Sequence, residues 1–239
     1  MNDVAHANTG TLVSWAAVNW TLSHSRNGEP TTSSITELFG RGAEQWYAAR
    51  AINPQRAARI LAGRLVVRDL VAERGKGRWA GFEPTTQGRK PVITDSDVDF
   101  SITHSAQWLV AAIVEAGQVG VDVETHTSEF DHPGLMRRMC TADELEQAWM
   151  LDPAIRRGWL ARLWTAKEAV SKLDGCGLRS DFRLMQLGDR IPVGGAEHPL
   201  VASIAVRQPD KARRGGERVF TLLHPRIAPG SASAAEVMT

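Results

Sequence analysis

The stretch QVGVDVE, residues 118–124, alternates apolar and polar positions in the way that a half-buried strand does. Its valines occupy every second position, so we expect them to face the core while Asp122 and Glu124 project together from the other side. Two residues along a strand advance about 6.6 Å, a separation that two carboxylates can close on one Mg²⁺ ion with oxygens at about 2.0–2.1 Å. The stretch predicts either a pair of metal ligands or a strand with a solvated acidic face.

A second pattern, WTAKEAVSK at residues 164–172, places Trp164, Glu168 and Lys172 four residues apart, on one face of a helix. Taken alone, it is better explained by a surface Glu–Lys pair beside a core tryptophan. The combination with the acidic strand favours chemistry, because a third carboxylate and nearby lysines suit metal-bridged phosphate chemistry.

Further elements are predicted on both sides of these two motifs. A helix begins at Asn53 and Pro54, with Arg56, Arg59, Arg64 and Arg68 on its polar side, and another begins at the capping box of Thr141 and Glu144. A third helix covers residues 159–173 and ends at Gly175 and Gly177. Strands are expected at residues 12–20, 99–105, 108–115, 118–124, 201–206 and 219–223.

The order of these elements predicts an α+β fold. LSHS at residues 22–25 and ITHS at residues 102–105 give mild support to two similar α/β lobes. We expect a flexible N-terminus at residues 1–10, an N-terminal lobe at 11–115, a C-terminal lobe at 116–225 and a flexible tail at 226–239.

Composition excludes several classes of function. The chain has 28 Lys and Arg against 27 Asp and Glu, so no overall field attracts it to nucleic acid or to an anionic membrane. Cys140 and Cys176 lack the spacing of a zinc site or a disulfide framework, which favours a reducing cytoplasm. No signal peptide and no apolar run of about 18 residues is found, so we expect neither secretion nor membrane insertion.

The two motifs resemble the hallmarks of the surfactin-type 4'-phosphopantetheinyl transferase family, a GxDxE strand followed by WxxKExxxK. Other similar segments follow in family order: Arg59–Gly63 to R-x-L-L-G, Gly88–Pro91 to a Gly-Lys-Pro turn, Phe100–Ser105 to F-N-x-S-H-S, Thr141–Glu144 to S-x-x-E, and Gly175–Leu178 to a glycine turn. Three departures stand out. Arg89 is inserted in the turn, Thr103 replaces the usual serine, and residues 20–50 show no counterpart of the family's basic N-terminal loop.

The resemblance implies two lobes related by a pseudo-twofold axis, each a small, mainly antiparallel sheet packed with helices. Coenzyme A would bind between them, and Asp122, Glu124 and Glu168 would hold Mg²⁺, with Mn²⁺ able to replace it. The enzyme would transfer the 4'-phosphopantetheine moiety to a serine hydroxyl of an apo acyl or peptidyl carrier protein and release adenosine 3',5'-bisphosphate. We expect a monomer. Whether the carrier serves fatty-acid, polyketide, siderophore or nonribosomal peptide synthesis is left open.

The resemblance also implies roles for single residues. Glu168 would be the general base and Lys172 would offset charge on the bridging phosphates. Glu144 is a second candidate for the base, although closing the capping box with Thr141 explains it equally well. The residues expected to contact phosphate groups of coenzyme A are Arg59, Arg89 or Lys90, Thr103, His104 and Lys172.

A carrier-docking surface is expected at residues 130–139 (FDHPGLMRRM), which mix apolar and basic side chains, because carrier proteins are typically acidic. Two other functions stay open at this stage. The three carboxylates alone equally permit another Mg²⁺-dependent phosphotransferase or phosphohydrolase. A non-catalytic carrier-binding module with the same fold would show no turnover, and its binding to the carrier would be unaffected by loss of Asp122 or Glu168.

Overall fold

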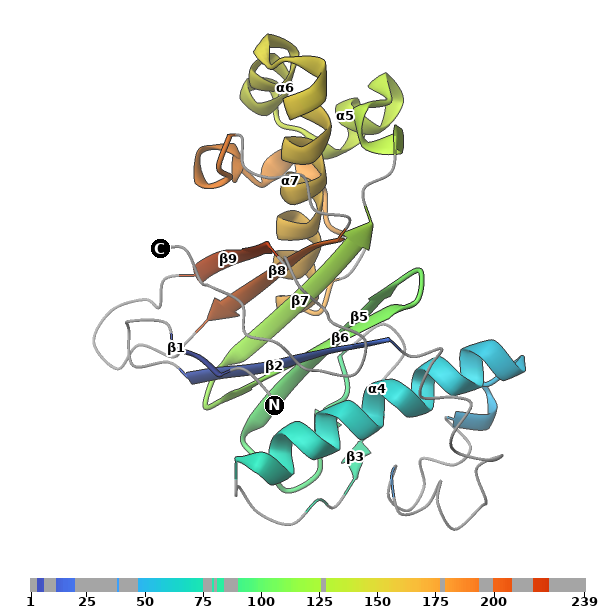
Figure 1. Cartoon of the computed structure of the whole chain (residues 1–239). Helices are drawn as coiled ribbons and strands as arrows, with labels where there is room; N and C mark the ends of the chain where they lie inside the picture. The colour runs from blue at the N-terminus through green and yellow to red at the C-terminus, as the bar shows by residue number, and fades with distance from the viewer. Residues whose placement is uncertain are drawn as a thin grey trace.

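The computed structural model describes residues 4–6, 12–19, 38, 47–74, 79, 81–83, 90–125, 128–176, 179–193, 200–207 and 217–223. These residues form three antiparallel sheets and two long helices with several short ones (Figure 1). The strands are β1 (Val4–His6), β2 (Leu12–Asn19), β3 (Phe82–Glu83), β4 (Val92–Ile93), β5 (Val98–Ser105), β6 (Trp108–Glu115), β7 (Gln118–Thr125), β8 (Leu200–Arg207) and β9 (Glu217–Leu223). The α-helices are α4 (Pro54–Glu73), α5 (Pro133–Met139), α6 (Ala142–Met150) and α7 (Pro153–Leu173), and the 3-10 helices are η1 (Ser128–Asp131), η3 (Phe182–Leu184) and η4 (Gly188–Arg190).

The first sheet has the strand order β1-β2-β6-β5, and α4 packs against it (Figure 1). Asn53 caps α4 by accepting a hydrogen bond from the Arg56 backbone N–H at 2.8 Å, and Pro54 occupies the first turn, as predicted. Val67 and Leu70 of α4 are buried in a cluster with Phe100, Ile113 and other residues of the sheet. The helix therefore covers one face of this sheet.

The second large sheet has the order β7-β8-β9, and α7 lies along β7 and β8 (Figure 1). The approach is close at Gly120, where a Cβ atom would lie 1.8 Å from the Ala169 carbonyl oxygen and 2.6 Å from the Leu173 backbone nitrogen. Only glycine permits this contact. The glycine of the acidic strand thus fixes how near α7 can come to Asp122.

The valines of β7 face a core that both large sheets share. Val119, Val121 and Val123 are fully buried and pack with Val110, Val114 and other residues of the first sheet. Each buried valine contributes roughly 1.5–3 kcal/mol relative to an exposed one. Since the alternation is strict, this burial turns Asp122 and Glu124 to the opposite face, as the sequence predicted.

The C-terminus of α7 is set by Gly175, which has a positive φ of 69°. The Gly175 backbone N–H donates to the Lys172 carbonyl at 3.1 Å, and the Cys176 N–H donates to the Ser171 carbonyl at 3.0 Å. These two hydrogen bonds form a Schellman motif, in which glycine adopts the left-handed conformation without a steric penalty from a Cβ atom. It ends the helix one turn beyond Glu168 and so leaves Lys172 in the last turn.

Several elements differ from the predictions. Val4–His6 forms β1 and pairs with β2, so the N-terminus expected to be flexible is in part a strand. The last long helix begins at Pro153 rather than at residue 159, because Asp152 caps it by accepting from the Ala154 N–H at 2.8 Å. Arg64, predicted on the polar side of α4, is half-buried, with its guanidinium 5.8 Å from the centre of the Phe100 ring.

Some predictions lie outside the described residues: Arg89, Gly177, the LSHS repeat and the tail at 226–239. Among the described helices, none is long and apolar enough to cross a bilayer.

Candidate active site

The site lies where β5 and β7, the outer strands of their respective sheets, run side by side (Figure 1). Here the backbone N–H groups of β7 donate hydrogen bonds to side chains at alternate positions of β5 instead of to its backbone carbonyls. The Asp99 carboxylate accepts from the Val119 backbone N–H at 2.7 Å, and the Ser101 hydroxyl accepts from the Val121 N–H at 3.1 Å. This seam continues along the strands, so that the next alternate residue, Thr103, meets a side chain of β7.

Asp122 is the most buried carboxylate of the seam, with 4% of its surface exposed. Its Oδ1 atom accepts from the Thr103 hydroxyl at 2.9 Å and from the Lys172 ammonium at 2.5 Å. Its Oδ2 atom is buried and has no hydrogen-bond partner among the residues described. Burial raises the pKa of Asp122, and the neighbouring Lys172 opposes that rise.

Glu124 follows on the same face of β7. The Ser105 hydroxyl donates to its Oε2 atom at 2.9 Å and accepts from the Thr125 backbone N–H at 3.3 Å. Burial raises the pKa of Glu124 and the charge of Asp122 adds to the rise, while Ser105 and the Trp164 indole N–H oppose it. Sequence reasoning gave no role to Ser105, although its place in the β5 alternation with Thr103 could have indicated one.

Glu168 comes to this region from α7 and is 6% exposed. Burial raises the pKa of Glu168 to about 7, with further contributions from Asp122 and Glu124, while Lys172 opposes the rise. Helix α7, which carries Glu168, packs closely against β7, which carries Asp122 and Glu124, and its nearest approach is at Gly120 and Ala169. In the described part of the chain, however, no three acidic, histidine or cysteine side chains are already arranged around one metal position.

The chemistry of the site nevertheless fits a divalent cation. Burial raises the pKa of each of the three carboxyl groups, the charge of Asp122 raises the pKa values of Glu124 and Glu168 further, and the buried Asp122 Oδ2 atom has no hydrogen-bond donor in the described structure. Oxygen ligands of this kind are those that Mg²⁺ prefers. In the absence of a metal ion, the ammonium group of Lys172 balances the charge of the Asp122 carboxylate.

Replacing Lys172 by methionine is therefore expected to destabilise the fold by about 3 kcal/mol at pH 8, because it leaves the buried Asp122 carboxylate without a cation. Burial raises the pKa of Asp122, so acidification toward pH 4 neutralises the group and should make the loss smaller. Urea unfolding of both proteins at the two pH values measures this. An equal loss at both would show that Lys172 does not act through charge.

The residues expected to contact phosphate have other partners. Lys90 donates to the Asp99 carboxylate and to the Val119 carbonyl oxygen, both at 2.5 Å, and so belongs to the seam. The buried Thr103 hydroxyl is engaged by Asp122 and Lys172. His104 is exposed, and its pKa is lowered by burial of part of the ring and then by the charge of Arg59. Arg59 and Lys172 therefore supply positive charge near His104, whose own imidazole is neutral near pH 7.

Glu144 does not lie among these residues, which corrects its candidacy as the base. It is fully buried and closes the predicted capping box with Thr141. Its carboxylate also pairs with the buried Lys167 and accepts from the backbone N–H groups of Leu187 and Gly188 at 2.8 and 2.9 Å. With its acceptors occupied by structural donors, Glu144 has no free lone pair facing a substrate.

The predicted carrier-docking segment also differs from expectation. Phe130, Met136 and Met139 are buried in the core cluster of α7, and the exposed residues of the segment are His132, Pro133, Arg137 and Arg138. The apolar component expected on the surface is therefore turned inward. The centre of the Phe130 ring lies 6.2 Å from that of the Trp164 ring, so this segment packs against α7, the helix that carries Glu168.

Comparison with known proteins agrees with this geometry. Residues 118–196 match the family model described as the 4'-phosphopantetheinyl transferase superfamily. This part of the chain begins with β7, runs past η4 and carries Asp122, Glu124 and Glu168. The seam strand β5, with Thr103 and His104, precedes it.

Three curated relatives are similar over a wider range. The L-aminoadipate-semialdehyde dehydrogenase-phosphopantetheinyl transferase of Mus musculus is 29% identical over 60% of this chain and 55% of its own length. The 4'-phosphopantetheinyl transferase psf-1 of Bacillus pumilus is 31% identical over 51% of this chain and 52% of its own. The 4'-phosphopantetheinyl transferase HetI of Nostoc sp. is 28% identical over 55% and 57%. The chain thus spans about half the length of these relatives, and the matches support the superfamily that the motifs predicted.

Proposed function

We propose that this protein transfers the 4'-phosphopantetheine moiety of coenzyme A to a serine hydroxyl of an apo acyl or peptidyl carrier protein. The observation that carries the proposal is the close packing of α7, which bears Glu168, against β7, which bears Asp122 and Glu124, inside the segment that matches the superfamily. The names of the relatives point to the same transfer reaction.

Residues of the site have properties that suit this chemistry. The serine oxygen would attack the phosphorus that carries the pantetheine arm, and the bond from that phosphorus to the oxygen bridging the two phosphates would break. Adenosine 3',5'-bisphosphate leaves with this oxygen. Glu168 would accept the serine proton directly or through a water molecule.

Positive charge at the site would come from two sources. A Mg²⁺ or Mn²⁺ ion bound by Asp122, Glu124 and Glu168 would neutralise the diphosphate and polarise the phosphorus under attack. Lys172, which lies 2.5 Å from Asp122, would offset charge on the bridging phosphates, and Arg59 and His104 would contact other phosphate oxygens.

Finer features are part of the proposal. We assign the protein to the surfactin type, with the two large sheets and their helices α4 and α7 as similar lobes related by a pseudo-twofold axis. We propose that it acts as a cytoplasmic monomer, with no membrane or nucleic-acid partner. Its lobes would comprise residues 11–115 and 116–225.

The transfer itself is tested by incubating the protein with coenzyme A, Mg²⁺ and a panel of apo carrier proteins, and measuring the intact mass of each carrier. A gain of one phosphopantetheine on at least one carrier, absent when its serine is replaced by alanine, is the expected result. Unchanged carrier masses together with hydrolysis of a phosphate ester would refute the transferase and favour a phosphohydrolase.

A further inference from the structure

The ammonium group of Lys172 contacts a carboxylate that we propose as a ligand of the divalent ion. Its Nζ atom donates to the Asp122 Oδ1 atom at 2.5 Å and to the Thr103 hydroxyl at 3.0 Å. The Thr103 hydroxyl donates to the same Oδ1 atom at 2.9 Å. One oxygen of Asp122 therefore accepts from two donors, while its Oδ2 atom is buried and accepts from none in the described part of the chain.

A second cation at Asp122 would meet the charge of Lys172. Two positive charges a few ångströms apart repel, and the repulsion is stronger where less water surrounds them. Asp122 is only 4% exposed, so little water screens such a pair. Contact of both cations with this one carboxylate is therefore unfavourable.

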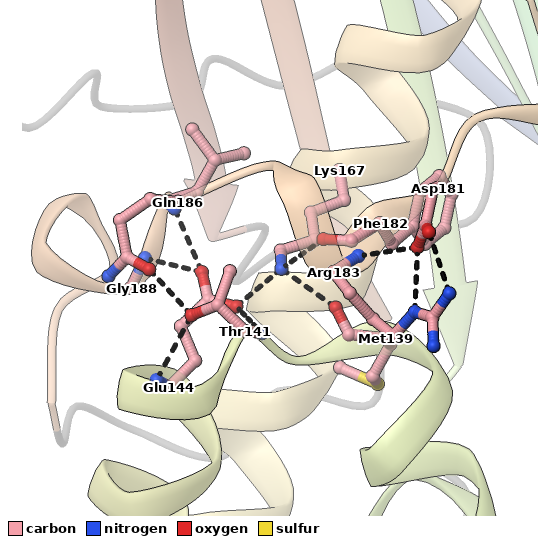
Figure 2. A network of polar contacts seen from close by, with 10 residues as sticks. Met139, Thr141, Glu144, Lys167, Asp181, Phe182, Arg183, Gln186 and Gly188 are labelled. Atoms are coloured by element: carbon pink, nitrogen blue, oxygen red, sulfur yellow. Dashed lines mark hydrogen bonds and ion pairs between the residues drawn. The ribbon is translucent and has the colours of Figure 1, made fainter.

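The surroundings of Lys172 allow its side chain to leave Asp122. The side chain is 27% exposed and has a flexible stem. Lys167, which precedes it on α7, is the opposite case, because its side chain is fully buried (Figure 2). It pairs with the Glu144 carboxylate and donates to the carbonyl oxygens of Met139 at 2.7 Å and Phe182 at 2.9 Å, which uses all three of its N–H donors. Lys167 is thus fixed, whereas Lys172 can exchange its partner for water or for a ligand.

We infer that Lys172 is an internal counter-ion that competes with the divalent ion for Asp122, and that binding of the ion releases its ammonium group toward the phosphates of the substrate. The inference rests on the proposed function only in taking Asp122 as a ligand of that ion. A buried carboxylate without a counter-ion is costly, so Asp122 keeps one cation both before and after the ion binds. One lysine can thereby balance the carboxylate first and offset phosphate charge afterwards.

The first test uses the full chain and measures Mn²⁺ binding by electron paramagnetic resonance, without coenzyme A or carrier. Lys172→Met removes the competing charge, and we expect the folded variant to bind Mn²⁺ about tenfold more tightly than the parent. The matched control is Arg207→Met, which removes a cation that lies 2.8 Å from Asp174, at the same end of α7. Both partners of that pair are partly exposed, so water and salt screen the charge and the Mn²⁺ affinity should stay as in the parent.

A second measurement uses the parent protein and so tests the inference even where Lys172→Met does not fold. Brief acetylation, located by peptide mass spectrometry, measures how readily each lysine amine reacts. We expect the acetylation rate of Lys172 to rise severalfold when Mn²⁺ is added, because the ion releases the amine from Asp122. The internal control is Lys90, whose ammonium group pairs with Asp99 and should react at the same rate with and without Mn²⁺.

The outcomes separate this inference from the proposed function. Mn²⁺ binding no tighter in folded Lys172→Met than in the parent would overturn the inference, as would an unchanged Lys172 acetylation rate with Mn²⁺ bound or no Mn²⁺ binding by the parent. Transfer to a carrier would leave the proposed function standing in each of these cases. Tighter Mn²⁺ binding by Lys172→Met and faster acetylation of Lys172, in a protein that transfers nothing, would instead uphold the inference and refute the proposed function.

Discussion

Replacing Glu168 by glutamine is expected to lower the rate constant of transfer by about a thousandfold, because a positioned base contributes about 10²–10⁴-fold and glutamine cannot accept the proton. The side chain keeps its size, so packing between α7 and β7 should be preserved. Single-turnover conversion of an apo carrier, followed by intact mass, measures the rate.

The same substitution should stabilise the metal-free protein at pH 8. Burial raises the pKa of Glu168 from 4.5 to about 7, so the folded state holds its proton where the unfolded state has released it. The stability associated with this group is complete below pH 4.5 and is lost as pH rises through 7. Glutamine carries no charge, and we expect a gain of about 1–3 kcal/mol in the free energy of unfolding at pH 8 and little gain at pH 4.

The control for both measurements is Glu146→Gln, which changes an exposed glutamate of α6. It should leave the transfer rate and the pH dependence of stability as in the parent. A Glu168→Gln protein with parental activity would eliminate Glu168 as the base.

Gly120→Ala is expected to destabilise the protein by about 3–5 kcal/mol, since the new Cβ atom would lie 1.8 Å from the Ala169 carbonyl oxygen. Both partners are backbone, so no rotamer change can relieve the overlap and α7 must move away from β7. Glu168 and Lys172 move with it, and transfer should be lost as well. Urea unfolding and the carrier assay measure the two effects.

Gly134→Ala is the matched control, because the atoms nearest to its Cβ belong to the exposed His132 side chain, at 3.1 and 3.2 Å. That ring can shift, and we expect a change below about 1 kcal/mol. If Gly120→Ala were as stable as the control, the close approach of β7 and α7 would not be what places Glu168.

Periodic patterns in the sequence predicted most of the elements. The alternating valines of residues 118–124 predicted both β7 and the face of the strand that carries Asp122. This succeeded because the alternation can be read within the strand itself. The start of α7 was placed six residues late, although Asp152 and Pro153 form a cap and first-turn pair like that of Asn53 and Pro54. The N-terminal strand β1 was missed because its pairing with β2, not its composition, makes it a strand.

The site was predicted less completely than the fold, because its contacts join residues far apart in the chain. The capping box of Glu144 follows from local spacing. Its pairing with Lys167 depends on the packing of α6 against α7, and its hydrogen bonds from the Leu187 and Gly188 N–H groups depend on the position of η4 beside α6. Thr103 and Lys90 were expected to meet phosphate, but the seam between β5 and β7 engages both. No pattern within one strand reveals which strand of another sheet will lie beside it.

We propose that Asp122, Glu124 and Glu168 converge on one divalent ion that contacts coenzyme A. The most direct measurement is a crystal structure of the protein with coenzyme A and Mn²⁺, in which anomalous scattering locates the ion. We predict one strong peak within ligand distance of all three carboxylates and of the diphosphate. A peak elsewhere, or coenzyme A bound away from the seam of β5 and β7, would show that these three carboxylates do not form the metal site.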